Sequence, residues 1–392
     1  WQSKQTKSIC DGWKKKGYED IVKAKTGLRI DPYFSASKIR FIFDQNPDVY
    51  EKAKKGEVLF GTMDSWIVWK LSGSLTHITD VSNASRTLLF NIHTLSWDDE
   101  LLEMFDIPKC ILPQVKPTSY AYCKTAAYHF FGQEVPICCV VGDQQAALFG
   151  QGCFGAGGIK NTYGTGGFML MNTGKRIVES KNGLLSTVAW QIGDQVDYAL
   201  EGSIFVSGSL MKWLRDQMQL FENTKDTQAM AESVENTNGV YIVPAFVGLG
   251  APYWDDACQA SILGLTFGAN KNHIVRAALE SMAYQSKDVL EAMRQDSQIN
   301  ITSMKVDGGA CANDFLLQFQ SDLLQMPVQR FKTNELTALG AAYLAGLSCG
   351  YWTQDELGVE LSKEFVPEKS KEEMDSLYSN WKKAVKTCQS YK

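Results

Sequence analysis

The sequence predicts an α/β protein of two domains, on three observations. Segments with the spacing of strands alternate with segments that have the spacing of helices. The chain has 392 residues, which exceeds the size at which one core usually divides. Its character also changes near residues 150–155, where helical segments give way to strands. We therefore predict one domain in residues 1–150 and a second in residues 151–392.

The first half is predicted to be mainly helical. Residues 1–30 are polar and rich in lysine, with helical stretches that end at Asp31-Pro32. Residues 35–45 place Ile39, Ile42 and Phe43 on one face, which predicts a helix with Ser35 as its cap. The other expected elements are a short strand at 58–61, a tryptophan-rich helix at 63–71, a buried strand at 137–141 and a short helix at 144–150.

The second half is predicted to alternate strands and helices. The small residues at 337–347 predict a helix that could pack very closely on a neighbour, and a lysine-rich amphipathic helix closes the chain. On that last helix, Lys382, Lys383 and Lys386 are expected to face solvent. The other expected elements are a hairpin at 155–172, further strands at 184–202, helices at 205–218, 274–293 and 313–324, and a strand at 305–307.

Composition narrows the class of protein. Hydrophobic content of 44% and charged content of 21% are ordinary for a globular protein, and the net charge of −5 argues against nucleic acid as the main partner. No apolar run is long enough to span a bilayer, and the N-terminus does not resemble a signal peptide. The ten cysteines are scattered without a C-x-x-C pair, so we expect reduced thiols in a cytoplasmic protein rather than a zinc site.

Asp143 follows an apolar run, residues 135–141, and precedes the amides Gln144 and Gln145. Ligands of open α/β sheets gather at the carboxyl ends of strands. An acid at that place can accept the proton of an alcohol that attacks phosphorus. The same position also suits an ordinary helix cap, because aspartate is a preferred cap residue. The local sequence leaves both interpretations open.

Two glycine-rich segments are candidates for binding phosphate. Residues 163–168 place Thr165 among three glycines, whose backbone can approach a ligand closely. Residues 308–313 lie between a predicted strand and a helix, a junction that suits a nucleotide. Residues 202–208 are a similar but weaker case. The alternatives are an ordinary hairpin and tight connections, and they remain open for each segment alone.

Together these segments resemble the FGGY carbohydrate kinase family. The resemblance rests on residues 142–151 and 161–166, and it extends over residues 30–35, 60–62, 83–87, 90–95, 243–246, 252–255, 306–309 and 338–343. It covers essentially the whole chain and is typical of the glycerol-phosphorylating members. It implies two actin-like (ribonuclease H-like) ATPase domains around a cleft. The implied reaction is phosphorylation of glycerol to sn-glycerol 3-phosphate in glycerol catabolism, with ATP and Mg²⁺.

The resemblance implies roles for residues on the glycerol side. Asp143 resembles the general base that takes the proton of the glycerol 3-hydroxyl. Tyr33 and Gln144 resemble residues that bond to the glycerol hydroxyls. Trp1 and Phe168 resemble apolar walls against the carbon backbone, although aromatic residues are core residues by default.

The resemblance also implies nucleotide contacts. Thr165 resembles the threonine near the transferred phosphate, and Gly208, Gly309 and Asn313 resemble residues that contact the adenine nucleotide. Lys212 stands where the family often has glutamine, so no role is assigned to it. Closure of the domains would exclude water from the reaction.

The resemblance begins at Trp1, inside the family's first domain. The first phosphate loop, an arginine–glutamate pair that grips glycerol and a metal-associated aspartate have no counterpart in the sequence. We therefore expect an N-terminally truncated first domain, no metal ligand within the chain, and impaired activity of the 392-residue chain alone.

The loop at residues 124–133 carries His129, which by default is a surface-loop histidine. The loop lacks the glycine-rich, arginine-containing pattern of members inhibited by fructose 1,6-bisphosphate. It resembles instead the Tyr-His-Phe loop of members whose histidine is phosphorylated by the phosphocarrier HPr. This implies that His129 is a regulatory phosphorylation site, and we also expect a homo-oligomer.

Two rival functions remain open. A non-catalytic, actin-like module would bind nucleotide without turnover, but it would have no need of a polyol pocket such as Tyr33, Gln144 and Phe168. A kinase for another polyol or a sugar is the other rival. The compact set of predicted contacts favours glycerol, and competition between glycerol, erythritol and xylulose would decide.

Overall fold

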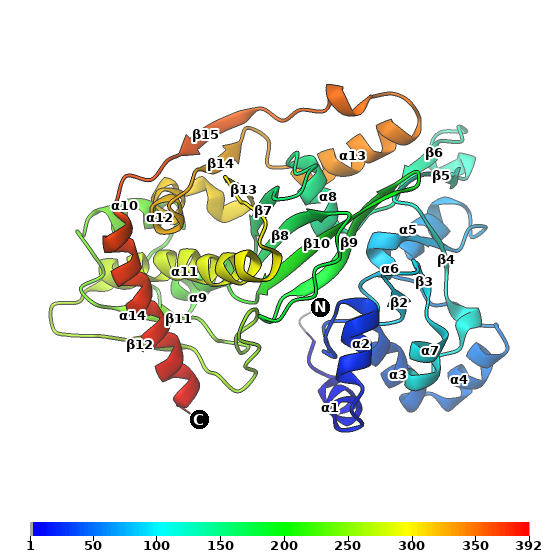
Figure 1. Cartoon of the computed structure of the whole chain (residues 1–392), viewed down its shortest axis with the longest axis horizontal. Coiled ribbons are helices and arrows are strands. Elements are labelled where there is room, and N and C mark those ends of the chain that lie inside the picture. Colours follow the sequence, from blue (N-terminus) through cyan, green and yellow to red (C-terminus); the bar gives the residue numbers. More distant parts are fainter. Residues whose placement is uncertain (1–2, 392) are drawn as a thin grey trace.

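The computed structural model describes residues 3–391 and has an α/β fold (Figure 1). The helices are α1 (Lys7–Lys15), α2 (Glu19–Thr26), α3 (Ser35–Gln45), α4 (Pro47–Lys54), α5 (Met63–Leu71), α6 (Val81–Ala84), α7 (Asp99–Phe105), α8 (Asp143–Gly150), α9 (Gly208–Asp216), α10 (Asp226–Glu232), α11 (Lys271–Ser297), α12 (Asp314–Leu324), α13 (Leu336–Ser348) and α14 (Lys371–Ser390). The strands are β1 (Ile78–Asp80), β2 (Phe90–Asn91), β3 (Ser96–Trp97), β4 (Gln114–Lys116), β5 (Ser119–Lys124), β6 (Pro136–Cys139), β7 (Ile159–Tyr163), β8 (Gly167–Gly174), β9 (Leu185–Ile192), β10 (Gln195–Ile204), β11 (Tyr241–Val243), β12 (Ser261–Leu263), β13 (Met304–Asp307), β14 (Val328–Phe331) and β15 (Leu361–Phe365).

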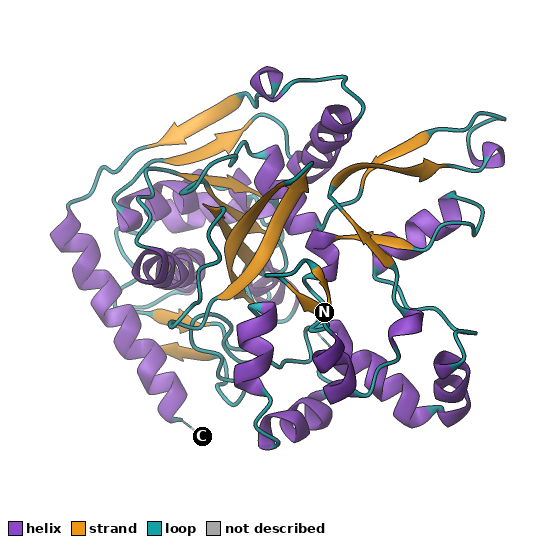
Figure 2. Cartoon of the chain, turned by 45° about the vertical axis from the view of Figure 1, so that its right-hand side comes forward, coloured by secondary structure: helices purple, strands orange, loops and turns teal. Residues whose placement is uncertain are grey.

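A mixed sheet forms the centre of the molecule (Figure 2). Within residues 3–391 it has nine strands in the order β15-β14-β13-β7-β8-β10-β9-β5-β6. β13 runs parallel to both β7 and β14, whereas β7, β8, β10 and β9 pair antiparallel in that order. β5 and β6 come from the first half of the chain and join the sheet beside β9. The sheet therefore connects the two predicted halves.

Helices cover both faces of this sheet. Met169 and Met171 of β8 belong to the largest hydrophobic core, which contains α11, α12 and α14. Leu170, between them, packs instead with residues of α8 and α13. Because successive side chains of a strand point to opposite faces, the two groups of helices lie on opposite sides of the sheet. The helices α1, α2, α3 and α7 build a separate core beside it, at the lower right of Figure 1.

The predicted helices are present, with shifts at their ends. Residues 205–218 were expected to be helical, but α9 begins at Gly208. Ser35 was expected to cap α3, but Phe34 is the capping residue, with extended backbone, and Ser35 is the first helical residue. The N–H of Ala36 donates to the carbonyl of Thr87, so a tertiary contact supports the end of the helix where a side-chain cap was expected.

Two strand predictions need correction. Residues 58–61 form no strand, because their backbone contacts a short turn rather than a neighbouring strand: the N–H of Phe60 donates to the carbonyl of Ile111 at 2.8 Å. The strand predicted at 137–141 is β6, which starts and ends earlier and lies at the edge of the sheet. Its apolar composition predicted full burial, but Pro136 is exposed and Ile137 is only half-buried.

The prediction of close packing by the small-residue helix is confirmed. A Cβ atom on Gly340 of α13 would overlap the carbonyl oxygen of Ala146 in α8, and one on Gly150 would overlap the carbonyl of Leu336. The two helices thus meet backbone to backbone through these glycines. This contact fixes α8, whose first residue is Asp143, against the second half of the chain.

Polar contacts anchor the closing helix. Most apolar residues of α11 are buried, but so are charged residues of this helix, including Asp288. The hydroxyl of Tyr378 and the indole N–H of Trp381, both on α14, donate to Asp288 at 2.6 and 2.8 Å. Burial raises the pKa of Asp288 to about 6. The two donors compensate part of the cost of burying this carboxyl group.

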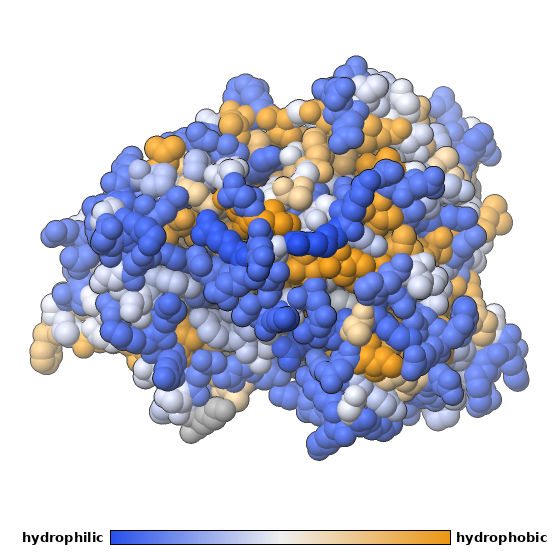
Figure 3. Space-filling model, viewed as in Figure 1, coloured by the Kyte–Doolittle hydropathy of each residue, from blue (hydrophilic) through white to orange (hydrophobic). Residues whose placement is uncertain are grey.

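No helix in residues 3–391 is both long and apolar enough to cross a membrane. The face seen in Figure 3 is mostly hydrophilic, with orange areas near its centre and along its upper edge.

Candidate active site

The parallel strands β7 and β13 end side by side at the centre of the site. Thr162 of β7 is the register partner of Asp307 of β13. β7 then enters the Gly164-Thr165-Gly166 turn, and β13 enters the turn at Gly308. Gly308 has φ of 95°, and a Cβ atom there would overlap the backbone of Tyr163. Glycine is therefore required for the two turns to lie in contact.

A cavity of about 880 Å³ opens beside these turns. Its lining includes Thr165, Gly208, Gly309 and Asn313, the residues predicted to contact the nucleotide. They come from the β7–β8 turn, the start of α9 and the junction before α12. The structure therefore brings together residues that lie as far apart in the sequence as 165 and 313. Lys212, for which no role was predicted, also lines this cavity.

The phosphate-turn and hairpin interpretations of residues 163–168 are both compatible with the structure. β7 and β8 do form an antiparallel hairpin. The turn between them is tied to α9, because the N–H of Gly208 donates to the carbonyl of Gly164 and the hydroxyl of Ser209 donates to that of Thr165. Asn313 also combines a structural and a candidate binding role. Its Oδ1 accepts from the N–H of Leu316 at 3.0 Å, which caps α12, and the residue lines the cavity.

Asp143 is exposed and is the first residue of α8, directly after the Gly142 cap. The cap interpretation of Asp143 is therefore not observed. The N–H of Gln144 donates to Asp143 Oδ1 at 2.8 Å, and Gln144 Nε2 lies 3.4 Å from Oδ2. The carboxylate is thus oriented by the residue that follows it and remains accessible to a proton donor.

Lys160 of β7 lies behind Gln144 and is completely buried. Its Nζ donates to Gln144 Oε1 and, at 2.9 Å, to the hydroxyl of Thr162. Burial lowers the pKa of this ammonium group, and the negative charges of Asp307, Asp143 and Glu201 oppose that effect. A buried cation between carboxylates is an arrangement common at functional sites.

Tyr33 lies in the turn before α3, beside an ion pair between the half-buried Arg86 and the buried Glu201. Arg86 donates to Glu201 Oε1 at 2.8 Å, and the hydroxyl of Ser203 donates to the same oxygen at 2.9 Å. The Arg86 guanidinium lies 5.8 Å from the centre of the Tyr33 ring. Burial, followed by the charge of Glu201, raises the pKa of Tyr33 to about 12, and Asp143 contributes in the same direction. Tyr33 therefore remains a neutral hydroxyl near Asp143.

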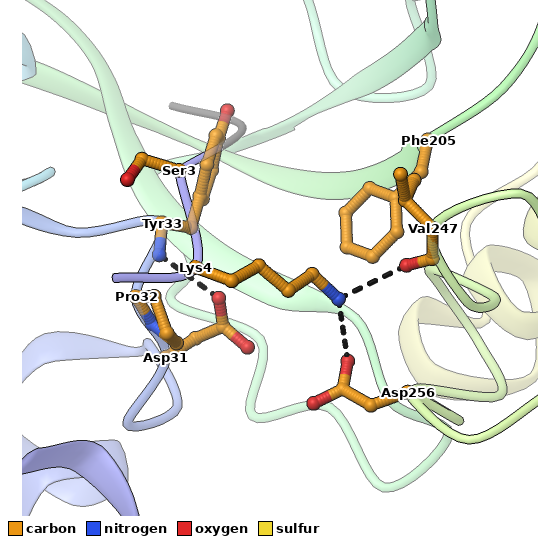
Figure 4. A pocket seen from close by; sticks show the side chains of 8 residues that line it. All are labelled: Ser3, Lys4, Asp31, Pro32, Tyr33, Phe205, Val247 and Asp256. Carbon is orange, nitrogen blue, oxygen red and sulfur yellow. Dashed lines mark hydrogen bonds and ion pairs between the residues drawn. The ribbon is translucent and has the colours of Figure 1, made fainter. Parts of the chain in front are cut away.

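Contacts cross between the two halves of the chain next to Tyr33. Tyr33 and Phe205 line a small cavity of about 30 Å³, and Figure 4 shows the side chains around it. Lys4 extends across it, and its Nζ donates to the carbonyl of Val247 at 2.9 Å and to Asp256 at 3.0 Å. Phe205 and Val247 also line the large cavity. The two cavities are therefore neighbours.

The other predicted residues are placed as follows. Phe168 is half-buried on β8, where its register partners are Thr162 and Ser203. His129 is exposed in a short turn, Ala127–His129, within the loop between β5 and β6. Trp1 was predicted to contact the substrate, and it lies outside the described residues.

Four charged residues of the site had no predicted role: Arg86, Lys160, Glu201 and Asp307. Lys160, Glu201 and Asp307 interrupt strands whose other residues are mainly apolar or small, and all three are buried. Charged side chains are rarely buried unless they are paired. Their presence inside strands was a signal that could have identified them.

The comparisons with known proteins agree with this geometry. Residues 1–150 match the N-terminal domain, and residues 159–349 the C-terminal domain, of the FGGY family of carbohydrate kinases. The chain is 57% identical to a glycerol kinase of Geobacillus kaustophilus and 56% identical to one of Thermus thermophilus. In both cases the match covers 100% of this chain and 80% of the relative. These coverages do not support the expectation that the first domain is truncated before Trp1.

Solved structures show the same architecture. The crystal structure of Plasmodium falciparum glycerol kinase with ADP matches with a TM-score of 0.91 at 35% identity, over 98% of this chain and 77% of that chain. A gluconate kinase from Lactobacillus acidophilus matches with a TM-score of 0.86 at 20% identity, over 98% of this chain and 78% of that chain. The latter likeness shows the fold alone.

Proposed function

Because the chain belongs to the FGGY family of carbohydrate kinases, we propose that it transfers the γ-phosphoryl group of ATP to glycerol, yielding sn-glycerol 3-phosphate and ADP. The identity of 57% to a glycerol kinase supports glycerol as the acceptor. The observation that carries the proposal is the position of Asp143. It is an exposed carboxylate joined through Gln144, Lys160 and Thr162 to the strand that enters the large cavity.

The proposed glycerol site lies on the side of Asp143 and Tyr33. Asp143 is the general base, which takes the proton of the attacking hydroxyl as the oxygen–phosphorus bond forms. Tyr33 and Gln144 bond to glycerol hydroxyls, and Phe168 packs against the carbon chain. Trp1 is proposed as a further apolar contact. Phosphoryl transfer needs mainly positioning and neutralisation of charge, and these side chains supply the positioning.

The proposed nucleotide site is the cavity of about 880 Å³, a volume within the usual range for ligand sites. Thr165 lies in the turn that would face the transferred phosphate. Gly208, Gly309 and Asn313 border the cavity from α9 and from the junction before α12. Their small or polar side chains leave room for a nucleotide to approach the backbone.

Mg²⁺ is proposed to accompany ATP. This ion is usually held by one or two carboxylates together with waters and the phosphates of the substrate. No metal ligand was expected from the sequence, but Asp307 fits such a role, because its Oδ1 is buried and has no hydrogen-bond partner within residues 3–391. When bound, Mg²⁺ would neutralise charge on the phosphates.

Residues 1–150 and 151–392 are proposed as the two domains that close around the substrates. The Arg86–Glu201 pair and the Lys4–Asp256 pair join these parts on either side of Tyr33. Closure would exclude water and so limit wasteful hydrolysis of ATP.

The test measures ADP release by the purified chain with ATP and Mg²⁺, in the presence of glycerol, erythritol or xylulose. We expect release to require a polyol and to be fastest with glycerol. Equal release without any polyol, or faster release with xylulose, would contradict the proposal. Nucleotide binding without turnover would favour the non-catalytic module.

His129 is proposed as a phosphorylation site for the phosphocarrier HPr. It is exposed next to Tyr128, a residue that is 73% exposed, and its Nε2 donates to the carbonyl of Lys70 at 2.9 Å. That bond leaves the lone pair on Nδ1, the nitrogen that can accept a phosphoryl group. A homo-oligomer and a cytoplasmic location are further proposals that rest on the family resemblance and the scattered cysteines.

The prediction for His129 is tested with radiolabelled phosphoenolpyruvate and the phosphocarrier system. We expect label on the wild-type chain and none on His129→Ala. His93→Ala is the matched control, because His93 is also exposed and its Nε2 also bonds to a carbonyl, that of Ala24 at 2.9 Å. Label that survives in His129→Ala, or no label on the wild type, would refute the assignment.

A further inference from the structure

A chain of hydrogen bonds links the buried strand β7 to the proposed base. Thr162 and Gln144 both accept from Lys160 Nζ, and Gln144 Nε2 faces Asp143 Oδ2 at 3.4 Å. Lys160 and Gln144 lie on different elements, β7 and α8, and 16 positions apart in the sequence. Lys160 is fully buried, so its ammonium group has few alternative partners.

The direction of these bonds is fixed by chemistry. An ammonium group has three donors and no acceptor, so Gln144 must turn its oxygen toward Lys160. The nitrogen of the same amide must then face the opposite way, toward Asp143 and the open side of α8. A free glutamine could present either end, because the two orientations have nearly the same shape. The buried lysine removes that choice.

We propose that Lys160 is a positioning residue that fixes the side-chain amide of Gln144, so that Gln144 acts toward the acceptor substrate only as a hydrogen-bond donor. This inference rests on the proposed function, because it concerns how the same site binds the acceptor substrate. A hydroxyl oxygen of the polyol must accept the bond from Nε2. The neighbouring hydroxyl is then free to donate its proton to Asp143.

Carboxylates surround the buried ammonium group of Lys160. The carboxylates of Asp307, Asp143 and Glu201 lie near enough to act on its charge from three elements, β13, α8 and β10. Burial lowers the pKa of Lys160, and these carboxylates oppose that effect. A neutral lysine could accept a bond and would no longer force the amide into one orientation.

The test is a double-mutant cycle with Lys160→Met and Gln144→Ala. Methionine is unbranched and only one heavy atom shorter than lysine, and it removes every donor. If Lys160 acts through Gln144, each single variant should raise the KM for glycerol about tenfold, the effect of losing roughly one hydrogen bond, with a smaller change in kcat. The double variant should show no further rise. Independent, multiplying effects would overturn the proposal, as would an unchanged KM in Lys160→Met.

A second pair of variants covers the case in which Lys160→Met fails to fold. Gln144→Glu keeps an oxygen toward Lys160 but turns a second carboxylate oxygen toward Asp143, where like charges repel. Gln144→Met removes both groups without adding charge. We expect the KM for glycerol to be higher in Gln144→Glu than in Gln144→Met. An equal or lower KM in Gln144→Glu would show that the amide is not held in this orientation.

The two proposals fail in different ways. A wild-type chain without glycerol-dependent ADP release would overturn the proposed function. The wild-type chain could have that activity while the effects of the two single variants on the KM multiply in the double variant. That result would overturn only the role of Lys160. A purely structural role for Lys160 would lower the melting temperature and the active fraction but would leave the KM for glycerol unchanged.

Discussion

Asp143→Asn should lower kcat for glycerol phosphorylation by about 10²–10⁴-fold, the usual contribution of a general base. The amide has nearly the same size as the carboxylate and can still accept the 2.8 Å bond from the N–H of Gln144. The start of α8 should therefore fold as before. What the variant lacks is an oxygen basic enough to take the proton of the attacking hydroxyl. The measurement is coupled ADP release at saturating glycerol and ATP.

The control for this variant is Asp194→Asn. Asp194 is exposed in the turn between β9 and β10, so the same chemical change there should leave kcat unaltered. The affinity for ADP and the melting temperature should be the same in both variants as in the wild type. Activity of Asp143→Asn within tenfold of the wild type would show that another group takes the proton.

Gly340→Val should destabilise the protein by about 1–3 kcal/mol or more, the usual cost of overpacking a close contact. Gly340 of α13 lies against the backbone of Ala146, and even a Cβ atom would overlap its carbonyl oxygen. Rigid backbone rather than a movable side chain blocks the space. α8 and α13 would have to separate, which would also displace Asp143 at the start of α8. The measurement is the midpoint of chemical unfolding, with ADP release as a second readout.

Ala342→Val is the matched control, since Ala342 lies on the exposed side of the same helix two positions away. It carries the same β-branched side chain in a helix, which costs less than about 1 kcal/mol. Equal unfolding midpoints for Gly340→Val and Ala342→Val would mean that the two helices do not meet as closely as described.

Much of the secondary structure could be predicted because its signals are local. The apolar stripe of residues 274–293 and the small residues of 337–347 correspond to α11 and α13. The predictions fail where the secondary structure depends on pairing with a neighbouring strand. Residues 58–61 have strand composition but no strand beside them, and β6 is apolar but lies at the edge of the sheet. Pairing partners come from distant segments, which local composition does not encode.

The candidate site was predictable in part. Asp143, the Thr165 turn and the Gly308-Gly309 turn stand out as residues that suit a ligand at strand ends, and the structure places the two turns in contact. The roles of Lys160 and of the Arg86–Glu201 pair were not predictable in this way. Lys160 and Glu201 stand out as charged residues inside strands, but the role of each depends on its burial and on a partner up to 115 positions away in the sequence.

The α/β class, most helices and the residues suited to phosphoryl transfer could be predicted from the sequence alone. Periodicity and turn chemistry are properties of neighbouring residues, so they can be read without the fold. The contacts between polar groups, in contrast, are known only from the tertiary structure. It turned the amide of Gln144 toward a buried lysine and joined the two halves through Arg86 and Glu201. The physical reason is that desolvation and hydrogen-bond direction depend on atoms brought together from distant parts of the chain.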